Sequence, residues 1–242
     1  MNTPSLKLAL VGYGRIGREV ARVAEERGHE IVAIFDIDRP LREDSNLAGV
    51  EVLIEFSLAE AVPGTLREAA RRGIPVVEGT TGWYHCLEEL TSLPGLTMIY
   101  SPNFSLGVYV FSRLVREAAR RLGAWEEFDV YVHEWHHRGK VDSPSGTARK
   151  LAQILLEEIP HKERVLEDRC DGRRIDPEEL HVTSTRAGLI PGIHEVGFTS
   201  GGETLTLRHQ AHSRECFARG AVRAAEWIVG RRGIFTLEDM ME

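Results

Sequence analysis

Short apolar runs alternate with amphipathic segments along the first hundred residues. The runs at 6–11, 31–36, 52–56, 74–78 and 96–100 are rich in Val, Ile and Leu, which predicts buried strands. Helical spacing follows the first run through Ala24, and a second helix is predicted over 59–72, closed by Gly73. Strand and helix in turn are typical of a parallel, doubly wound α/β sheet. The polar link 37–50 holds at most one helical turn, so the sheet should be smaller than usual on the side of the second strand.

The pattern changes after residue 104. Long helices are predicted over 106–122 and from 145 to about 159, and residues 160–179 are charged without a reliable period. Strands are predicted at 181–185, 193–198 and 204–209, the last two forming a hairpin around Gly201-Gly202. A final helix at about 216–230 should pack back on the first domain. We therefore expect a Rossmann-type dinucleotide-binding domain, residues 1–104 plus 214–242, and a smaller α+β domain, residues 105–213, with a mainly antiparallel open sheet.

A glycine-rich loop joins the first predicted strand to the first helix. The order strand, G-x-G-x-x-G, helix, strand and acid is the dinucleotide-binding fingerprint, and it predicts NADH or NADPH as cofactor. Asp36 follows the second strand, nineteen residues after Gly17, and should bind the adenosine ribose. Asp36 favours NADH, but Arg39 could neutralise it in part, so NADPH stays open. The loop residues are Gly12, Tyr13, Gly14, Arg15, Ile16 and Gly17.

Three further segments follow the third, fourth and fifth predicted strands. Ligands of parallel sheets bind beyond the carboxyl ends of the strands, so these segments should line one crevice. A loop without function is the alternative for each segment taken singly. The cofactor-binding candidates here are Phe56, Gly79, Thr80, Thr81, Ser101, Pro102, Asn103 and Phe104.

The segment 133–148, HEWHHRGKVDSPSGTA, concentrates candidate chemistry. Histidines and Lys140 can transfer protons and hold anions. A Ser-Gly-Thr helix start offers backbone N–H groups and the positive end of the helix dipole to a carboxylate. The combination predicts a small, multiply negative substrate. The candidates are His136, His137, Lys140, Ser145, Gly146 and Thr147.

The same segment contains H-E-x-x-H at 133–137, the zinc-hydrolase pattern. That pattern requires a helix, whereas the preceding residues 128–132 predict a strand. On a strand the two histidines would lie about 13 Å apart, too far to share one ion at about 2 Å from each. We therefore predict no metal. An exposed polar strand end is the remaining plain alternative.

Composition narrows the class of protein. The chain has 242 residues, a formal net charge of −7 and no basic stripe, so we expect no nucleic-acid partner. The three cysteines are widely spaced and suit a reducing compartment. Neither a signal peptide nor a long apolar run is present in the sequence, so we expect a cytoplasmic protein without a membrane partner.

The motifs resemble those of the 4-hydroxy-tetrahydrodipicolinate reductase family over nearly the whole chain. The family pattern E-x-H-H-x-x-K-x-D-A-P-S-G-T-A is matched from Glu134 to Ala148, with Ser143 in place of alanine. G-T-T-G matches at 79–82 and A-P-N-F-S at 101–105, with Ser101 in place of alanine. The segments 186–194 and 213–217 also resemble family motifs. The glycine loop is one residue shorter than the family form, which bears on cofactor preference.

The resemblance implies a reductase that transfers hydride from NAD(P)H to a cyclic imine dicarboxylate, with loss of water, in diaminopimelate and lysine synthesis. It implies that His136 is the proton donor or acceptor, that Lys140 is a proton donor, and that His137, Gly146 and Thr147 bind substrate. A homotetramer is also implied. Two alternatives stay open: another NAD(P)-dependent amino- or imino-acid dehydrogenase, and a non-catalytic nucleotide sensor.

Overall fold

The computed structural model describes residues 4–167, 169–170 and 172–242, which fall into two compact units. The first unit runs to Leu106 and resumes over Arg214–Glu242, and the second spans Gly107–Ser213. The boundaries expected from the sequence lie within two residues of these. Residues 1–3, which we assigned to the first domain, lie outside the described residues.

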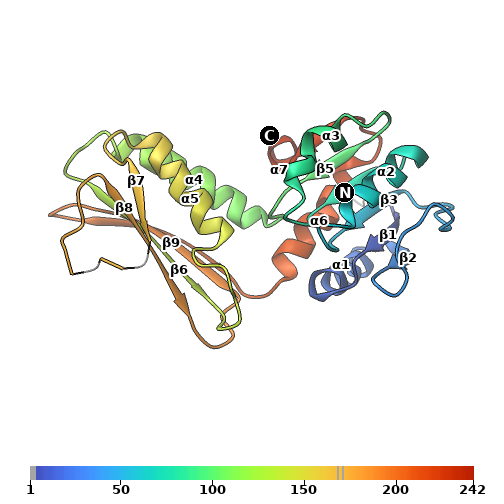
Figure 1. Cartoon of the computed structure of the whole chain (residues 1–242), viewed down its shortest axis with the longest axis horizontal. Coiled ribbons are helices and arrows are strands. Elements are labelled where there is room, and N and C mark those ends of the chain that lie inside the picture. Colours follow the sequence, from blue (N-terminus) through green and yellow to red (C-terminus); the bar gives the residue numbers. More distant parts are fainter. Residues whose placement is uncertain (1–3, 168, 171) are drawn as a thin grey trace. The chain divides into compact units, whose positions relative to one another are not determined.

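The first unit is built on a six-stranded parallel sheet (Figure 1). The predicted doubly wound α/β class is confirmed. β2 lies at the edge of the sheet. This agrees with the short link after it, from which we expected a smaller sheet on the side of the second strand. From one edge to the other the strands are β11 (Ile234–Thr236), β5 (Met98–Tyr100), β4 (Val76–Glu78), β3 (Val52–Glu55), β1 (Lys7–Val11) and β2 (Glu30–Phe35).

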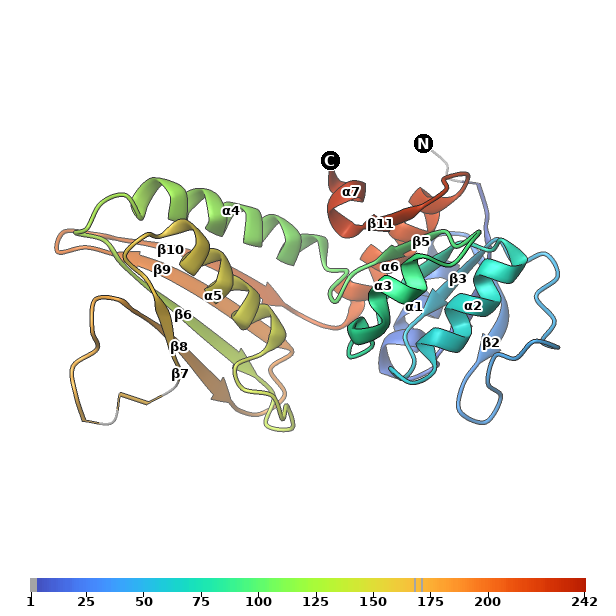
Figure 2. The ribbon, with the colours of Figure 1, turned by 45° about the horizontal axis from the view of Figure 1, so that its top comes forward.

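Helices cover both faces of this sheet (Figure 2). α1 (Arg15–Glu26) and α6 (Glu215–Ile228) pack together on one face, so the last predicted helix does return to the first unit. α2 (Val62–Arg72) and the short α3 (Leu87–Thr91) cover the other face, preceded by the 3₁₀ turn η1 (Tyr84–Cys86). None of the helices in the described part of the chain is long and apolar enough to cross a membrane.

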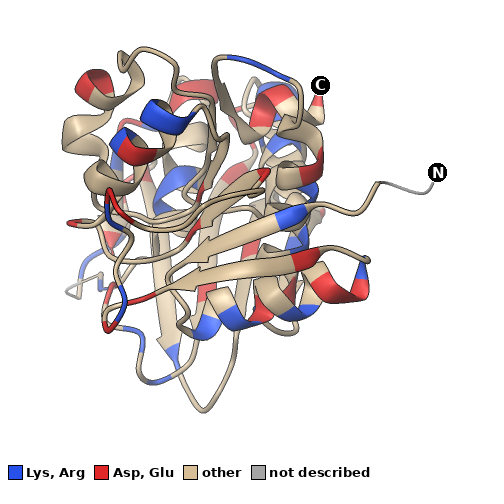
Figure 3. Ribbon diagram, turned by 90° about the vertical axis from the view of Figure 1, so that its right-hand side faces the viewer, with Lys and Arg blue, Asp and Glu red and all other residues tan. Residues whose placement is uncertain are grey.

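Charged residues of both signs are interspersed over the first unit (Figure 3). On α1, Arg22 pairs with Glu19 and Glu26 of its own helix and with Glu215 of α6. Exposed pairs of this kind contribute about 0–1 kcal/mol each, so burial of the apolar faces stabilises the contact between these two helices far more than the charges do.

The second unit has a five-stranded sheet with both long helices on one face. α4 (Leu106–Leu122) and α5 (Gly146–Glu158) bury an apolar core against the sheet that includes Phe111, Leu151 and Phe198. β10 and β9 form the predicted hairpin and β9 pairs antiparallel with β6. The strand order is β10 (Thr204–Ala211), β9 (Gly192–Thr199), β6 (Asp129–His136), β8 (Glu179–Arg186) and β7 (Arg164–Glu167).

Two parts of the sequence-based prediction need correction. The second sheet is mixed, not mainly antiparallel, because β6–β8 and β8–β7 are parallel pairs. The segment 160–179 contains β7, which we did not predict. β7 has four mostly exposed residues and therefore lacks the alternation that identifies a half-buried strand. β11 and the terminal α7 (Leu237–Met241) were also not predicted, because each is very short.

Candidate active site

The glycine loop of the first unit leaves room for a ligand at one position only. Gly12 has φ +90°, and a Cβ there would lie 2.3 Å from the carbonyl oxygen of Phe56. A Cβ on Gly17 would lie 2.1 Å from the carbonyl oxygen of Gly12. Gly14, the N-cap of α1, has no neighbouring atom within 4 Å of a built Cβ. Two glycines therefore permit tight packing, and the third leaves open space at the helix start, where a pyrophosphate fits.

The predicted strand-end segments do meet beside this loop. A Cβ on Gly79 would lie 2.1 Å from the ring of Phe56, and the rings of Phe56 and Phe104 meet edge to face at 6.2 Å. The hydroxyl of Ser101 and the backbone of Asn103 form a closed turn, with Ser101 Oγ donating to the Asn103 carbonyl at 2.8 Å. Among the other candidates, Thr80 is buried, Tyr13 and Ile16 are half-buried, and Arg15, Thr81 and Pro102 are exposed.

Asp36 lies exposed at the carboxyl end of β2. A tight turn brings Arg39 opposite Asp36 through two backbone hydrogen bonds, of 3.1 and 3.0 Å. The guanidinium of Arg39 lies 6.0 Å from the centre of the Phe35 ring. The acid and the nearby cation foreseen from the sequence are therefore paired through their backbones.

Two buried carboxyl groups in the same unit were not foreseen. Glu55 and Glu78 are register partners on β3 and β4 and are almost fully buried. Burial raises the pKa of each, and the charge of Glu55 raises that of Glu78 further. They accept backbone hydrogen bonds from Ser57 and Thr80, so they help to fix the two loops after their strands. Their place at strand ends was visible in the sequence, but their burial was not.

In the second unit, Glu134 lies at the centre of a polar cluster on the core face of β6. Its side chain is fully buried. One carboxylate oxygen, Oε1, accepts hydrogen bonds from the backbone of Ser145 at 2.9 Å, Ser184 Oγ at 3.0 Å and Arg186 Nη2 at 2.8 Å. Burial alone would raise the pKa of Glu134, but the polar contact with His194 first, and then the hydrogen bonds from Ser145 and Arg186, outweigh it and hold the pKa far below its usual range.

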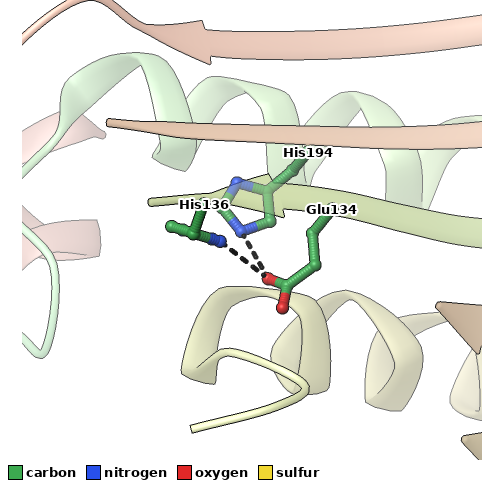
Figure 4. Close-up of side chains that lie close together, drawn as sticks. All are labelled: Glu134, His136 and His194. Atoms are coloured by element: carbon green, nitrogen blue, oxygen red, sulfur yellow. Dashed lines mark ion pairs between the residues drawn. The ribbon is translucent and has the colours of Figure 1, made fainter. Parts of the chain in front are cut away.

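Two imidazoles face the other oxygen of Glu134 (Figure 4). Glu134 Oε2 lies 3.4 Å from His136 Nδ1 and 3.3 Å from His194 Nε2. The two rings meet edge to face, with centroids 5.1 Å apart. His136 is 8% exposed, and burial lowers its pKa to about 4. His136 is therefore neutral near pH 7 in this state and can accept a proton.

Lys140 lies in the loop after β6 and pairs with Asp142, Nζ to Oδ1 at 2.7 Å. Partial burial would raise the pKa of Asp142, but the hydrogen bond from Lys140 outweighs it and lowers the pKa. The carbonyl of Asp142 also accepts from Arg186 Nη2 at 2.6 Å. His137 is half-buried, directly after the strand. Arg186 therefore binds both the loop that carries Lys140 and the carboxylate of Glu134.

The predicted Ser-Gly-Thr helix start is confirmed as the beginning of α5. Ser145 is its N-cap and accepts from the Ala148 N–H at 3.2 Å. A Cβ on Gly146 would meet nothing within 4 Å, and the N–H groups of Gly146 and Thr147 have no partner within the helix by its geometry. Ser145 itself is 3% exposed, and its hydroxyl also contacts His194 Nε2 at 3.1 Å. This geometry gives Ser145 a structural part as the N-cap, and its contact with substrate stays a prediction.

The H-E-x-x-H motif lies on β6 and directly after it, not on the helix that the zinc pattern requires. His133 points to the opposite face of the sheet and contacts Thr183 and Thr185. The described residues do contain another possible ligand group, since donor atoms of Glu134, His136 and His194 lie within 4.8 Å of one another. No local sequence pattern indicated this group, because His194 comes from the distant strand β9. A cation there would compete with Arg186, which already neutralises the carboxylate.

We predict that chelation will leave the activity of this chain unchanged. The carboxylate is charge-compensated by Arg186, and His136 serves the reaction best as a free base. Activity should be measured after treatment with EDTA or 1,10-phenanthroline, together with elemental analysis. Stoichiometric zinc whose removal abolishes activity, and whose return restores it, would contradict this prediction.

A parallel sheet with a glycine-lined helix start, joined to a separate unit with a buried acid–imidazole cluster, defines a two-unit nicotinamide-dependent oxidoreductase. The chain belongs to the dihydrodipicolinate reductase family, whose N-terminal model matches residues 6–104 and whose C-terminal model matches residues 107–241.

Individual relatives agree with this assignment. The chain is 41% identical to the 4-hydroxy-tetrahydrodipicolinate reductase of Archaeoglobus fulgidus, over 98% of this chain and all of that protein. It is 36% identical to that of Christiangramia forsetii, over 98% of both. Its fold resembles a dipicolinate-bound dihydrodipicolinate reductase from Paenisporosarcina, with a TM-score of 0.74 at 21% identity, over 98% of this chain and all of that one.

Proposed function

We propose that this chain reduces 4-hydroxy-tetrahydrodipicolinate to tetrahydrodipicolinate, the reaction for which its relatives are named. Water leaves the substrate, hydride adds to the ring, and a proton adds to the resulting carbanion or enamine. The observation that carries the proposal is the junction at Glu134, which joins the His136 end of β6 to the helix start at Gly146. A proton-transferring group and an anion-binding helix start thereby lie in one cluster.

The residues of the first unit fit a nicotinamide dinucleotide. The open space at Gly14 and the N-terminus of α1 would hold the pyrophosphate, and Asp36 the adenosine ribose. Phe56, Gly79 and Phe104 would line the crevice beyond the strand ends. When bound, the reduced nicotinamide supplies the hydride.

The second unit would bind the substrate and move the proton. Lys140, His137 and the N–H groups of Gly146 and Thr147 would neutralise the two carboxylates, because cations and helix starts favour anions. His136 takes part in proton transfer through the ring nitrogen that does not face Glu134, and Lys140 is the second proton donor. Arg186 and Asp142 hold the loop that carries Lys140.

A spectrophotometric assay tests the proposal. Freshly generated imine substrate should cause oxidation of NADH or NADPH, followed at 340 nm, whereas amino acids with NAD⁺ should give no reduction. Oxidation of an amino acid without turnover of the imine would favour a different dehydrogenase on this scaffold. Binding of NADH without turnover of either substrate class would favour a nucleotide sensor. Both results would refute the proposal.

We predict that NADH will work at least as well as NADPH. Asp36 repels a 2′-phosphate, and Arg39 across the turn offers only partial compensation. The ratio of kcat/KM for the two cofactors should be measured at one ionic strength. Asp36→Ala should move the ratio toward NADPH, and Asp38→Ala, an exposed neighbour, should not. A hundredfold preference of the wild-type enzyme for NADPH would contradict the prediction.

We further propose that four copies assemble through the open face of the second sheet. α4 and α5 cover one face, whereas the other carries an aromatic row of Tyr131, His133 and Trp135, with Trp135 beneath Arg208 at 5.5 Å. An uncovered sheet face of this kind is suited to a second copy. Light scattering should give four times 27.1 kDa. Trp135→Glu should lower that mass, and the control Trp125→Glu, on an exposed turn, should not.

We also propose a cytoplasmic location. Among the described residues, Cys86, Cys170 and Cys216 form no disulfide, as suits a reducing compartment. Fractionation of the source cells, with the chain followed by antibody, tests this.

A further inference from the structure

Within the described part of the chain, the hydrogen bonds of the buried Glu134 carboxylate are all made by one of its two oxygens, Oε1. The three donors to Oε1 come from two elements, namely the N-cap of α5 and the strand β8, which supplies both Ser184 and Arg186. Since Oε1 already accepts three hydrogen bonds, Oε2 is the carboxylate oxygen that can still interact with another group. Among the described residues Oε2 has no hydrogen-bond partner, and neither has His136 Nδ1, which lies 3.4 Å away.

We propose that Glu134 is a positioning residue for His136. Its Oε2 fixes the imidazole with the proton on Nδ1, and His194 competes for the same oxygen. This inference rests on the proposed function, in which His136 transfers the proton. At 3.4 Å the contact is longer than a formed hydrogen bond, and contacts of this kind commonly tighten when substrate binds.

The geometry explains which ring nitrogen of His136 is available for proton transfer. Nδ1 faces the carboxylate, and Nε2 borders Gly192, where a Cβ would lie 3.1 Å from it. A carboxylate beside Nδ1 favours the proton there and leaves Nε2 with its lone pair. The absence of a side chain at Gly192 keeps space open beside Nε2. His136 therefore presents one defined nitrogen instead of a mixture of two tautomers.

Four groups act on the charge of His136, and only one of them favours its protonated form. Glu134 on β6 raises the pKa of His136, whereas His194 on β9, Lys140 in the loop and Arg186 on β8 each lower it, in addition to burial. Behind His194 stands His209 of β10, its register partner. Because a single oxygen faces both His136 and His194, a proton on one imidazole disfavours a proton on the other.

This arrangement predicts opposite effects for two conservative variants. Glu134→Gln keeps the size of the side chain and removes the charge, so the pKa of His136 should fall by about one unit or more. His194→Gln removes the competing imidazole and keeps a group able to reach Ser145, so the pKa of His136 should rise. Glu195→Gln is the matched control, because Glu195 follows His194 on the same strand with its side chain on the opposite face.

Two measurements test the proposal. Nitrogen-15 NMR of the His136 ring, assigned by its loss in His136→Gln, should show Nδ1 protonated and Nε2 unprotonated in the wild-type chain at pH 7. In Glu134→Gln the Nε2-protonated tautomer should gain. The pH profile of kcat should show the limb due to His136 moving toward acid in Glu134→Gln and toward base in His194→Gln. Because His136 is already neutral at pH 7, kcat at pH 7 should fall in Glu134→Gln through loss of the Nδ1-protonated tautomer, with KM changed less than twofold.

Each other result overturns the inference. An Nε2-protonated wild-type ring would do so by itself, even if Glu134→Gln failed to fold. If the His136 limb of the kcat pH profile stays in place, or moves in the same direction in Glu134→Gln and His194→Gln, then Glu134 and His194 only fill space. The NMR result needs no substrate. A correct tautomer in a chain that does not turn over the imine would therefore refute the proposed function and leave the positioning intact.

Discussion

His136→Gln should lower kcat by about 10²-fold or more, because general acid–base catalysis contributes about 10²–10⁴. The affinity for NADH should change less than twofold, since His136 lies in the second unit and the glycine loop in the first. Fluorescence titration of NADH and steady-state kinetics with the imine measure the two effects separately.

Lys140→Met belongs to the same prediction and should behave differently. It removes a cation as well as a proton source, so KM for the imine should rise along with the fall in kcat. Loss of its partner also leaves Asp142 without its cation. Lys150→Met, an exposed lysine on α5, is the control and should resemble the wild type. Normal turnover in both His136→Gln and Lys140→Met, or loss of NADH binding in both, would refute the assignment of this segment to catalysis.

Two alanine substitutions in the glycine loop should separate stability from cofactor binding. Gly12→Ala places a Cβ against the backbone of Phe56 and requires a left-handed backbone, so it should destabilise the fold by several kcal/mol and lower Tm by about 5 °C or more. Gly14→Ala meets no protein atom, so Tm should stay within about 1 °C of the wild type. Because the new methyl group occupies the space assigned to the pyrophosphate, NADH affinity should fall about tenfold or more.

Calorimetry and NADH titration on both variants test this contrast. Gly28→Ala is a useful further control, because Gly28 also has a positive φ, of 85°, but is remote from the predicted crevice and has open space around it. If Gly14→Ala binds NADH as well as the wild type does, the pyrophosphate lies elsewhere. If Gly12→Ala keeps its full stability, the loop does not have the conformation described above.

The features that the sequence predicted are those with a strong local signal. The strand, glycine loop and helix at 6–26 combine an apolar run, turn chemistry and helical spacing, and the structure has β1, Gly12–Gly17 and α1 there. Gly73 closes α2 with φ 65°, as a helix-terminating glycine should. The N-cap at Ser145 could also be predicted, because N-cap preference depends on the side chain of the capping residue itself.

The features that were missed depend on partners distant in the sequence. His194 faces Glu134 because β9 runs antiparallel to β6 in the register that pairs those two residues, and no local pattern encodes that register. Arg186 reaches Glu134 across the parallel pair of β6 and β8. The one local clue was that Glu134 and His136 continue the buried row of Val130 and Val132. Polar side chains in such a row need buried partners, which should have prompted a search for them.

The measurement that tests the proposed reaction most directly is isotope transfer. The chain should be incubated with [4-²H]NADH, in each of its two stereochemical forms, and freshly generated imine, and the product analysed by mass spectrometry. We predict one deuterium in tetrahydrodipicolinate from one of the two forms, at a ring carbon, and none from the other. A product without deuterium from either form, or imine recovered unchanged while wild-type chain binds NADH, would contradict hydride transfer to this substrate.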